Sequence, residues 1–595
     1  MEKSLMIALV STPWPLFNRP SIQLGTLKAF ISHNMPETRV EALHIYLEVA
    51  AALGYPLYKE ISQSTWLAEP LYAALLYPEQ AKAMEKFWHR KASKTRHCKG
   101  VPFKKVCETL EAVSQQALSS YDWGSYSLIG FSICFSQLTS SLYFIRKIKQ
   151  MVPKVAIVIG GSSCSGPLGT SLAASFPEID FVVSGEGELP LLALIKQIKE
   201  HPEWRELRFV PKIEQITNID TLPLPDYDDY FRLLSSLGSE KAFLPKIPVE
   251  MSRGCWWNRC AFCNLNLQWR GYRAKSTKRV ISELKTLSDK YQVLAFSFMD
   301  NLLPSKETLT LCNGLRKSKR DFQLFAEIRA TTPPEILAAM GKAGIRDVQV
   351  GIEALSSSLL RKLNKGTTAM DNLEIMKHCE TPGLPTLTGN LIMEFPSSDD
   401  NDVKETLRVL DFARAMRPLK AIPFWLGYGS PVWEQPRIYG IRGISNHPNY
   451  KAIFPPSLFR SLNMMIQGYH GPIRRQRLLW QSVRQKVAEW QKEYQTLHAS
   501  PRPEPILSYL DGGEFLIIRQ RRAHADLMTH KLKGTSRKIY LFCQTQRTIQ
   551  EITARFPSFA SDKIEAFLRM MVGKRLMFQE GEKFLSLGVP MALFL

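Results

Sequence analysis

Residues 253–269 read RGCWWNRCAFCNLNLQW, and this stretch decides how the rest of the chain is interpreted. It holds three of the ten cysteines, Cys255, Cys260 and Cys263, within nine positions. Cysteine thiolates at such short spacings bind zinc or iron–sulfur clusters. The stretch therefore predicts a metal site with three thiolate ligands.

The number of ligands separates the two kinds of metal site. A structural zinc site takes four ligands, whereas the next cysteine and the next histidine along the chain are Cys312 and His378. Three ligands leave one coordination position open, which favours a 4Fe-4S cluster whose fourth iron binds an exogenous ligand. A zinc site completed by a distant residue remains the alternative.

Six candidate strands separated by helical segments occupy residues 246–440. They lie in IPVEMSRGC, VLAFSFMDN, FQLFAEIRA, DVQVGIEA, LTGNLIMEFP and KAIPFWLGYGSP. Six sequential βα units predict a partial, TIM-like (βα)6 barrel with its active site at the carboxyl ends of the strands. The cysteines follow the first strand, at that edge.

Residues 1–215 alternate in the same way. The apolar runs MIALVSTP, SLIGFSICF, VAIVIGG and FVVSGEGE are separated by helical patterns, which predicts a Rossmann-like parallel sheet. Loops at 11–15, 160–163 and 184–188 follow three of these strands, where open sheets bind ligands.

The remaining segments complete an α/β organisation. The proline-spaced residues 216–245 predict a linker, and residues 441–500 show a helical pattern. Residues 501–595 combine a strand pair, short helices and a final hairpin in the order of a winged helix.

The formal net charge of +22 is the one compositional anomaly. Its basic residues are dispersed and no nucleic-acid motif accompanies them, so a solvated basic face is favoured over a nucleic-acid surface. The apolar runs are far shorter than the ~20 residues of a membrane span, and the other seven cysteines are scattered. We expect a cytoplasmic protein without a membrane span.

The cysteine stretch resembles the cluster loop of the radical SAM superfamily. The usual spacing there is Cys-x3-Cys-x2-Cys, whereas this chain has four residues in the first interval; Phe262 before the third cysteine is as in the family. The resemblance implies that S-adenosylmethionine (SAM) chelates the open iron. It also implies that one electron, from an external donor such as flavodoxin or ferredoxin, cleaves SAM to a 5′-deoxyadenosyl radical.

The same resemblance implies contacts to SAM at later strand ends. Asp300 and Asn301 stand where the family contacts the methionine amino group, usually through glycine-rich backbone. Glu327 and Arg329 end the third strand, and arginine suits the SAM carboxylate. Glu353 ends the fourth strand, before LLRKLNKGTT, which also matches the family. Each alone could be a surface ion pair, but their recurrence at successive strand ends favours the site.

The first domain resembles the cobalamin-binding domain that precedes many radical SAM domains, through YSLIGFSICFSQL, GGSSCSG and VSGEGELPLL. The contacts that this implies are Gly160, Gly161, Ser162, Ser184, Gly185 and Glu186. The Asp-x-His-x-x-Gly motif that supplies the lower cobalt ligand is absent, and His44 lies in another element. The resemblance therefore implies base-off cobalamin without a protein histidine on cobalt.

These features predict a cobalamin-dependent radical SAM C-methyltransferase. LGYGSPVWEQPRIYGI and the tail resemble the peptide-maturation branch, which implies a peptide or small-molecule substrate. Two rivals stay open: a non-methylating radical enzyme, catalysing cyclisation or rearrangement in lipid, pigment or natural-product biosynthesis, and an Fe–S nucleic-acid-binding regulator.

Four aromatic residues near the expected site have open roles. Trp256 and Trp257 either shield the cluster or fill the barrel mouth, both of which bury aromatic surface. Tyr428 and Trp433 are candidates for a substrate pocket.

Overall fold

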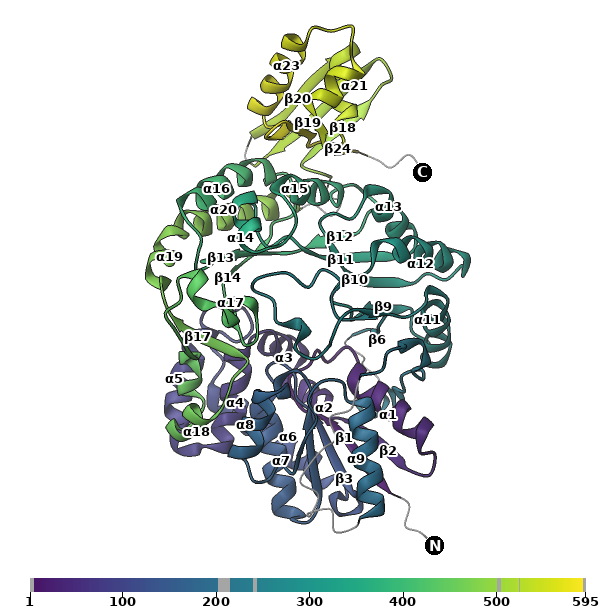
Figure 1. Ribbon diagram of the computed structural model, residues 1–595, viewed down its shortest axis with the longest axis vertical. Helices are drawn as coiled ribbons and strands as arrows, with labels where there is room; N and C mark the ends of the chain where they lie inside the picture. Colours follow the sequence, from purple (N-terminus) through teal and green to yellow (C-terminus); the bar gives the residue numbers. More distant parts are fainter. Residues whose placement is uncertain (1–4, 202–214, 239–242, 500–503, 524, 592–595) are drawn as a thin grey trace.

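The computed structural model describes residues 5–201, 215–238, 243–499, 504–523 and 525–591. Along the long axis of Figure 1, an N-terminal α/β domain lies at the bottom, a barrel-like domain in the middle and a small C-terminal domain at the top. None of the helices within these ranges is both long and apolar enough to cross a membrane.

The N-terminal domain is built on five parallel strands in the order β2-β1-β3-β4-β5. They are β1 (Met6–Ser11), β2 (Arg39–His44), β3 (Leu128–Ser132), β4 (Ala156–Gly160) and β5 (Phe181–Val182). Alternate residues of β1 enter two cores, Ile7 and Leu9 on one face and Ala8 and Val10 on the other. A strand buried on both faces reads as a continuous apolar run, which is why four of the five strands are predictable from sequence.

The fifth strand, β2, is absent from the prediction because RVEALH gives no continuous apolar run. It forms because its six residues pair in register with all of β1. The helices of this domain are α1 (Ile22–Asn34), α2 (Ile45–Leu53), α3 (Tyr55–Ser62), α4 (Thr65–Leu76), α5 (Ala81–Ala92), α6 (Phe103–Ser119), α7 (Leu138–Met151), α8 (Pro167–Ser175) and α9 (Glu188–Glu200).

The segment predicted as a linker contains helix α10 (Asp228–Ser236), which packs against both domains. The Tyr230 hydroxyl donates to the Phe17 carbonyl in the first domain, and the Tyr227 hydroxyl donates to the Pro248 carbonyl in the second, each at 2.7 Å. Both tyrosines are fully buried. The segment is therefore a structural joint rather than an extended tether.

The middle domain contains the six βα units that the sequence predicts, one of them split into two short strands. Its strands are β6 (Ile247–Val249), β9 (Ala295–Phe298), β10 (Gln323–Arg329), β11 (Ile345–Gly351), β12 (Thr386–Thr388), β13 (Asn390–Met393) and β14 (Lys420–Pro423). Its helices are α11 (Thr277–Tyr291), α12 (Ser305–Lys317), α13 (Pro334–Lys342), α14 (Ser357–Lys362), α15 (Ala369–His378) and α16 (Asp400–Ala413). Five strands form one parallel sheet, β12-β11-β10-β9-β6, and β13 pairs with β14. An isolated bridge from Glu353 to Leu391 joins the two.

The prediction that residues 441–500 are helical is wrong for their first half. An antiparallel sheet, β15-β17-β16, contains β15 (Leu426–Gly427), β16 (Gly443–Asn446) and β17 (Ile466–His470). These strands are too short to show a period of two, and their pairing with each other decides their conformation. The helices here are α17 (Pro431–Glu434), α18 (Pro456–Ser461), α19 (Ile473–Leu479) and α20 (Gln481–Leu497).

The C-terminal domain begins with a sheet in the order β20-β19-β18-β24, formed by β18 (Leu507–Asp511), β19 (Phe515–Arg522), β20 (Ala525–Lys533) and β24 (Val589–Pro590). It continues with α21 (Gly534–Phe542), β21 (Arg547–Thr548), α22 (Ile549–Arg555), α23 (Ser561–Gly573), β22 (Met577–Glu580) and β23 (Lys583–Ser586). This second part has the helix and hairpin order that the sequence predicts. Strand β20 is not predicted, because its alternation is masked by basic residues.

Candidate cofactor site

The cysteines lie on a loop whose two ends are held together by a short antiparallel ladder. Strand β7 (Ser252–Arg253) pairs with β8 (Arg273–Ala274), so residues 254–272 form a closed loop above the end of β6. Gly254 has φ +83°, and a Cβ atom there would lie 2.2 Å from the Gly271 carbonyl oxygen. Only glycine lets the two arms of the loop approach this closely.

Cys255, Cys260 and Cys263 are free thiols of intermediate exposure. Burial raises the pKa of Cys263 to about 11 and also raises the pKa of Cys260. In the ranges that the structure describes, no three His, Cys, Asp or Glu side chains converge as ligands of a single metal ion. A 4Fe-4S cluster does not need its ligands to converge on one ion, because each thiolate binds its own iron. Three nearby thiols on one loop fit this arrangement.

The cysteine loop rests on residues 363–366, which follow α14. The Ala261 amide donates to the Leu363 carbonyl at 2.9 Å, and Trp257 Nε1 donates to the Asn364 carbonyl at 3.0 Å. A Cβ atom on Gly366 would lie 2.2 Å from the Trp257 ring. The LNKG sequence is therefore the support of the loop.

Arg329, at the end of β10, packs against both tryptophans. Its guanidinium carbon lies 4.2 Å from the ring centroid of Trp257 and 5.2 Å from that of Trp256, distances typical of cation–π contacts. Its Nη2 donates to the Lys365 carbonyl at 2.7 Å. The tryptophans thus form part of the loop's attachment to the barrel, and a contact from Arg329 to SAM stays a prediction.

Asp300 and Asn301 follow β9 but have different surroundings. Asp300 is buried; it accepts hydrogen bonds from the Ser252 hydroxyl at 2.6 Å and the Met251 amide at 3.1 Å, and burial raises its pKa to about 7. It joins the ends of β6 and β9. Asn301 instead lines a cavity, and its buried Nδ2 has no hydrogen-bond partner among the described residues.

Two glutamates predicted to contact SAM lie at neighbouring strand ends. Burial, followed by the charges of Glu353 and Asp300, raises the pKa of Glu327 to about 7. Glu353 has φ +62°, and its Oε1 accepts from Lys365 Nζ at 3.2 Å. The positive charges of Lys365 and Arg329 also act on Cys260. The region around the loop therefore combines cations with carboxyl groups that can hold a proton near neutral pH.

A large cavity separates the N-terminal sheet from the cysteine loop. The space between its walls, including the part that is open to solvent, has a volume of about 1240 Å³. Gly160, Gly161, Gly185 and Glu186 line it from the N-terminal sheet. From the barrel it is lined by Glu250, Ser252, Arg253, Gly254, Gln268, Trp269, Met299 and Asn301.

The predicted cobalamin contacts divide into two sets. Gly160, Gly161, Gly185 and Glu186 line the cavity, whereas Ser162 and Ser184 are not among its lining residues. Ser184 Oγ instead accepts from the Gly166 amide at 2.8 Å. The Glu186 carboxylate forms ion pairs with Arg253 and Arg273.

Sequence reasoning missed these two arginines. Their signal is visible in hindsight, because Arg253 and Arg273 flank the cysteine loop and SGEGE supplies two carboxylates.

Tyr428 and Trp433 lie beside the loop as well. Their ring centroids are 4.4 Å apart, and Asn264 Nδ2 donates to the Tyr428 carbonyl at 3.2 Å. A Cβ atom on Gly429 would lie 2.4 Å from the Leu267 side chain. The turn at residues 428–430, far from the loop in sequence, is therefore a third support of the cysteine loop.

Comparison with known proteins agrees with this geometry. The family model described as the radical SAM superfamily matches residues 249–410, a range that contains all three loop cysteines. An uncharacterised methyltransferase of Pyrococcus horikoshii is 28% identical over 350 residues, which are 55% of this chain and 73% of that protein. The anaerobic magnesium-protoporphyrin IX monomethyl ester cyclase of Cereibacter sphaeroides is 26% identical over 46% of this chain and 47% of its own length.

The hopanoid C-3 methylase of Methylococcus capsulatus is 25% identical over 44% of this chain and 53% of its own length. The chain thus spans about half the length of this methylase and of the cyclase.

Two solved structures share the fold across both α/β domains. The cobalamin-dependent SAM radical enzyme OxsB with aqua-cobalamin bound superposes with a TM-score of 0.56 at 14% identity, covering 84% of this chain and 69% of OxsB. The radical SAM methyltransferase TsrM of Kitasatospora setae, with cobalamin and a [4Fe-4S] cluster bound, gives a TM-score of 0.51 at 14% identity, covering 82% and 91%. With the cysteine loop at the barrel edge, these matches identify the chain as a radical SAM enzyme, and its two α/β domains share the fold of the two structures that hold cobalamin.

Proposed function

We propose that the enzyme methylates an unactivated carbon, using a 4Fe-4S cluster on Cys255, Cys260 and Cys263 and a cobalamin. The cobalamin would bind in the cavity between the N-terminal sheet and the cysteine loop, here called the sheet-edge cavity. One observation carries the proposal. Gly254, the residue before Cys255, lines the same cavity as Gly160 and Gly161 of the N-terminal sheet. A group bound in the cavity would therefore lie next to a group bound by the loop.

The chain's own residues would position the reactants. When bound, the cluster supplies the electron that cleaves SAM, and cobalamin supplies a methyl group. Asn301 Nδ2, a donor without a partner in the described part of the chain, lies at the cavity wall, and Arg329 presents a positive charge near the thiols. Glu327, with its pKa raised to about 7, can hold a proton close to the strand ends.

Base-off binding of cobalamin is supported by the surroundings of His44 and by the residues that line the cavity. His44 Nδ1 lies 3.0 Å from the Ala42 carbonyl oxygen, and the ring packs against Tyr46 and Tyr230. The cavity-lining residues within the described ranges include no histidine. A protein ligand to cobalt would have to come from another side-chain type.

A peptide substrate is supported by the edge of the C-terminal sheet. Strand β20 is the terminal strand of its sheet, and none of the described strands pairs with its outer edge. Lys531 and Lys533 are exposed along it. An extended acidic peptide could pair with this edge through main-chain hydrogen bonds. A small molecule is the alternative, since the cyclase and the hopanoid methylase are named for small molecules.

Two other functions make different predictions. A non-methylating radical reaction has relatives named as cyclases, and product analysis separates it from methylation.

A nucleic-acid regulator would use the C-terminal hairpin. Here that hairpin packs on the barrel, because Glu580 accepts from the Met370 amide at 2.8 Å and from the Ser357 hydroxyl.

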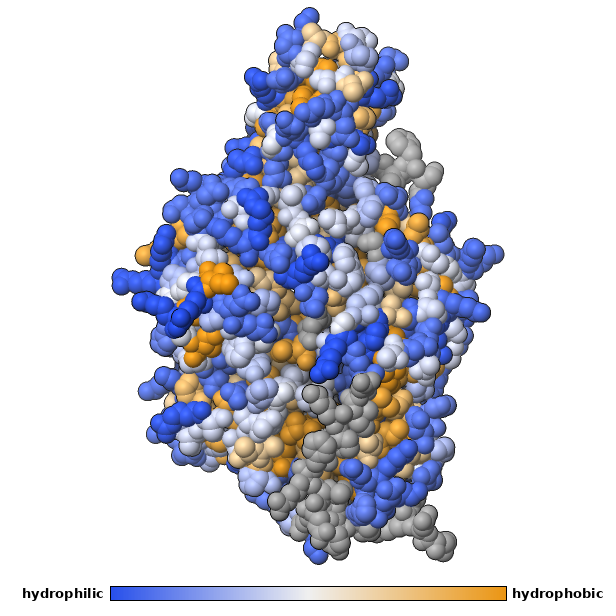
Figure 2. Space-filling model, viewed as in Figure 1, coloured by the Kyte–Doolittle hydropathy of each residue, from blue (hydrophilic) through white to orange (hydrophobic). Residues whose placement is uncertain are grey.

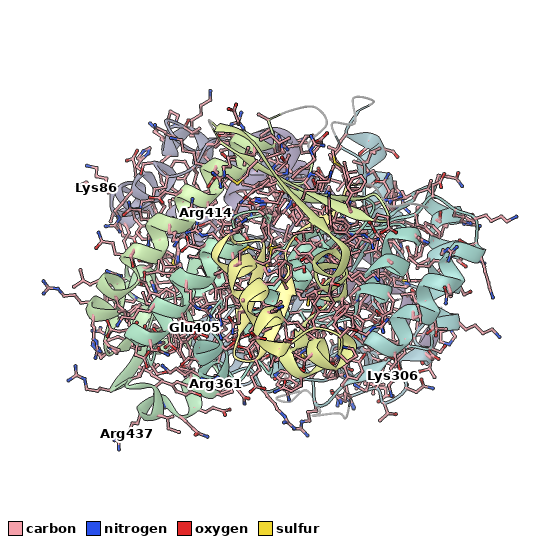
Figure 3. The ribbon with its side chains drawn as sticks, turned by 90° about the horizontal axis from the view of Figure 1, so that it is seen from above. Lys86, Lys306, Arg361, Glu405, Arg414 and Arg437 are labelled. Atoms are coloured by element: carbon pink, nitrogen blue, oxygen red, sulfur yellow. The ribbon has the colours of Figure 1, made fainter. Side chains whose placement is uncertain are left out.

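The distribution of charge also does not favour nucleic acid. Basic side chains such as Lys86, Lys306 and Arg437 project outward from separate places on the perimeter of the molecule (Figure 3). The face shown in Figure 2 is mainly hydrophilic, with apolar residues in separate patches. Charge spread over many faces is typical of a solvated surface rather than of one binding track.

The test uses protein purified and reconstituted without oxygen. We expect iron and sulfide for one 4Fe-4S cluster, bound cobalt, and 5′-deoxyadenosine after reduction with SAM. Cys260→Ala removes one ligand and should abolish both the cluster and SAM cleavage. Cys379→Ala, outside the loop, is the matched control and should retain both. Zinc in place of iron, without SAM cleavage, would overturn the proposal.

A further inference from the structure

The base of the cysteine loop carries two arginines on adjacent strands. In the β7–β8 ladder, Arg253 is directly opposite Arg273. Like charges in such cross-strand positions repel each other and destabilise the pair. Both side chains are largely buried, at 7% and 11% exposure, so solvent cannot screen the repulsion fully. The loop base needs carboxylates in order to close.

Those carboxylates come largely from the N-terminal domain. Glu186 Oε2 lies 3.3 Å from Arg253 Nη1 and accepts from Arg273 Nη1 at 3.1 Å, so one carboxylate bridges the two strands. Glu188 Oε1 accepts from Arg253 Nη2 at 2.7 Å. Within the barrel, Glu250 accepts from Arg253 at 2.9 and 3.0 Å. The side chains of Glu186 and Glu188 are only 5% and 6% exposed.

The bridging residue also belongs to the wall of the cavity. Gly185, Glu186 and Gly187 line it in sequence, between β5 and α9. Arg253 and Gly254 line it from the other side. A single short segment therefore contacts whatever occupies the cavity and, through its carboxylate, holds the base of the loop that bears the cysteines.

We propose that Glu186 is a positioning residue that couples occupancy of the sheet-edge cavity to the order of the cysteine loop. Filling the cavity fixes the 185–187 segment, which fixes the Arg253–Arg273 base and stabilises the loop in its ligating form. By thermodynamic linkage, a cluster on the loop must strengthen binding in the cavity by the same factor. This rests on the proposed function, in which the cavity binds cobalamin.

The test measures hydroxocobalamin binding by its visible absorbance, in full-length protein with and without a reconstituted cluster. In wild type we expect the cluster to lower the dissociation constant about fivefold or more, the range of typical coupling. Glu186→Gln keeps the side-chain shape but removes the bridging charge. It should reduce the ratio of the two dissociation constants, without and with the cluster, to about one.

A matched control comes from the same buried network. Glu283 pairs with Lys275 and Arg279 within the barrel and does not contact the N-terminal domain through these bonds. Glu283→Gln removes an equally buried carboxylate and should keep the wild-type ratio. If Glu186→Gln fails to fold, Glu186→Gln/Arg273→Gln removes the repulsion as well and should fold with a ratio of about one.

Three outcomes distinguish the failure modes. A wild-type protein that binds no cobalamin overturns the proposed function and the coupling together. Equal binding with and without the cluster overturns the coupling alone. An unchanged ratio in Glu186→Gln overturns the role of Glu186. Hydrogen exchange of residues 254–272 without cofactors gives an independent readout, because Glu186→Gln should speed exchange there and Glu283→Gln should not.

Discussion

At the scale of single residues, the cysteine loop depends on close contacts that tolerate no extra atoms. Gly254 admits the carbonyl of Gly271, and Gly366 lies under the Trp257 ring. Arg329 fills the remaining space beside that ring. None of these neighbours is near in sequence, so the motif letters alone do not show that they form one packed unit.

Gly366→Ala tests this contact. Its φ of +68° and a Cβ position 2.2 Å from the Trp257 ring should together lower the free energy of unfolding. We expect the steric part to cost about 1–3 kcal/mol and the iron content after reconstitution to fall. Gly440→Ala is the control, because φ there is +73° and, apart from its chain neighbours, no atom of the described residues lies within 4 Å of a Cβ placed on Gly440. It should show only a backbone cost of about 1–2 kcal/mol and keep its iron.

At the scale of elements, α15 connects the barrel to the C-terminal domain through a buried lysine. Lys377 is 1% exposed, and its Nζ donates to the Gln544 carbonyl. Burial lowers the pKa of Lys377 to about 7. On α14, by contrast, Asp399 and Asp402 raise the pKa of Lys362 despite its partial burial. The contribution of Lys377 to stability therefore rises with pH, whereas that of Lys362 falls as pH rises.

This contrast gives a prediction with a definite sign. Between pH 7 and the ordinary lysine pKa of about 10.4, unfolding lets Lys377 take up a proton, so its contribution to stability rises with pH. The gain in unfolding free energy of Lys377→Met over wild type should therefore be largest at pH 6.5 and become progressively smaller toward pH 10. Lys362→Met should lose stability at pH 6.5, because a raised pKa stabilises the fold below the unfolded value. Unfolding midpoints at pH 6.5, 8 and 9.5 check both; a gain for Lys377→Met that grows with pH would contradict the prediction.

At the scale of the whole molecule, a few buried groups fix the two α/β domains around the cavity. Besides the arginine–glutamate pairs, Tyr227, just before α10, and Tyr230, within it, form hydrogen bonds to opposite domains. Contacts of this kind are set by domain arrangement rather than by any local pattern.

Tyr227→Phe should destabilise the joint by about 1–3 kcal/mol, because it leaves the Pro248 carbonyl buried without its donor. Tyr55→Phe is the control: its ring packs against Phe17 and Phe243, and the described residues provide no hydrogen bond for its hydroxyl. Denaturant unfolding followed by circular dichroism measures the difference. Equal midpoints for the two variants would show that the α10 hydrogen bond contributes nothing.

The sequence by itself determined the three cysteines, the two runs of βα units and the family to which they belong. These features are local: thiol spacing and apolar runs follow from covalent order and from strands buried on both faces. Only the tertiary structure decided that Asp300 bonds to the first residue of β7, that Trp257 packs on Arg329, and that Glu186 bridges Arg253 and Arg273. It also decided β2, β16 and β17, whose short segments become strands through their partners. The physical reason is the same throughout, because a buried charge, ring or edge strand is stable only when a distant partner satisfies it.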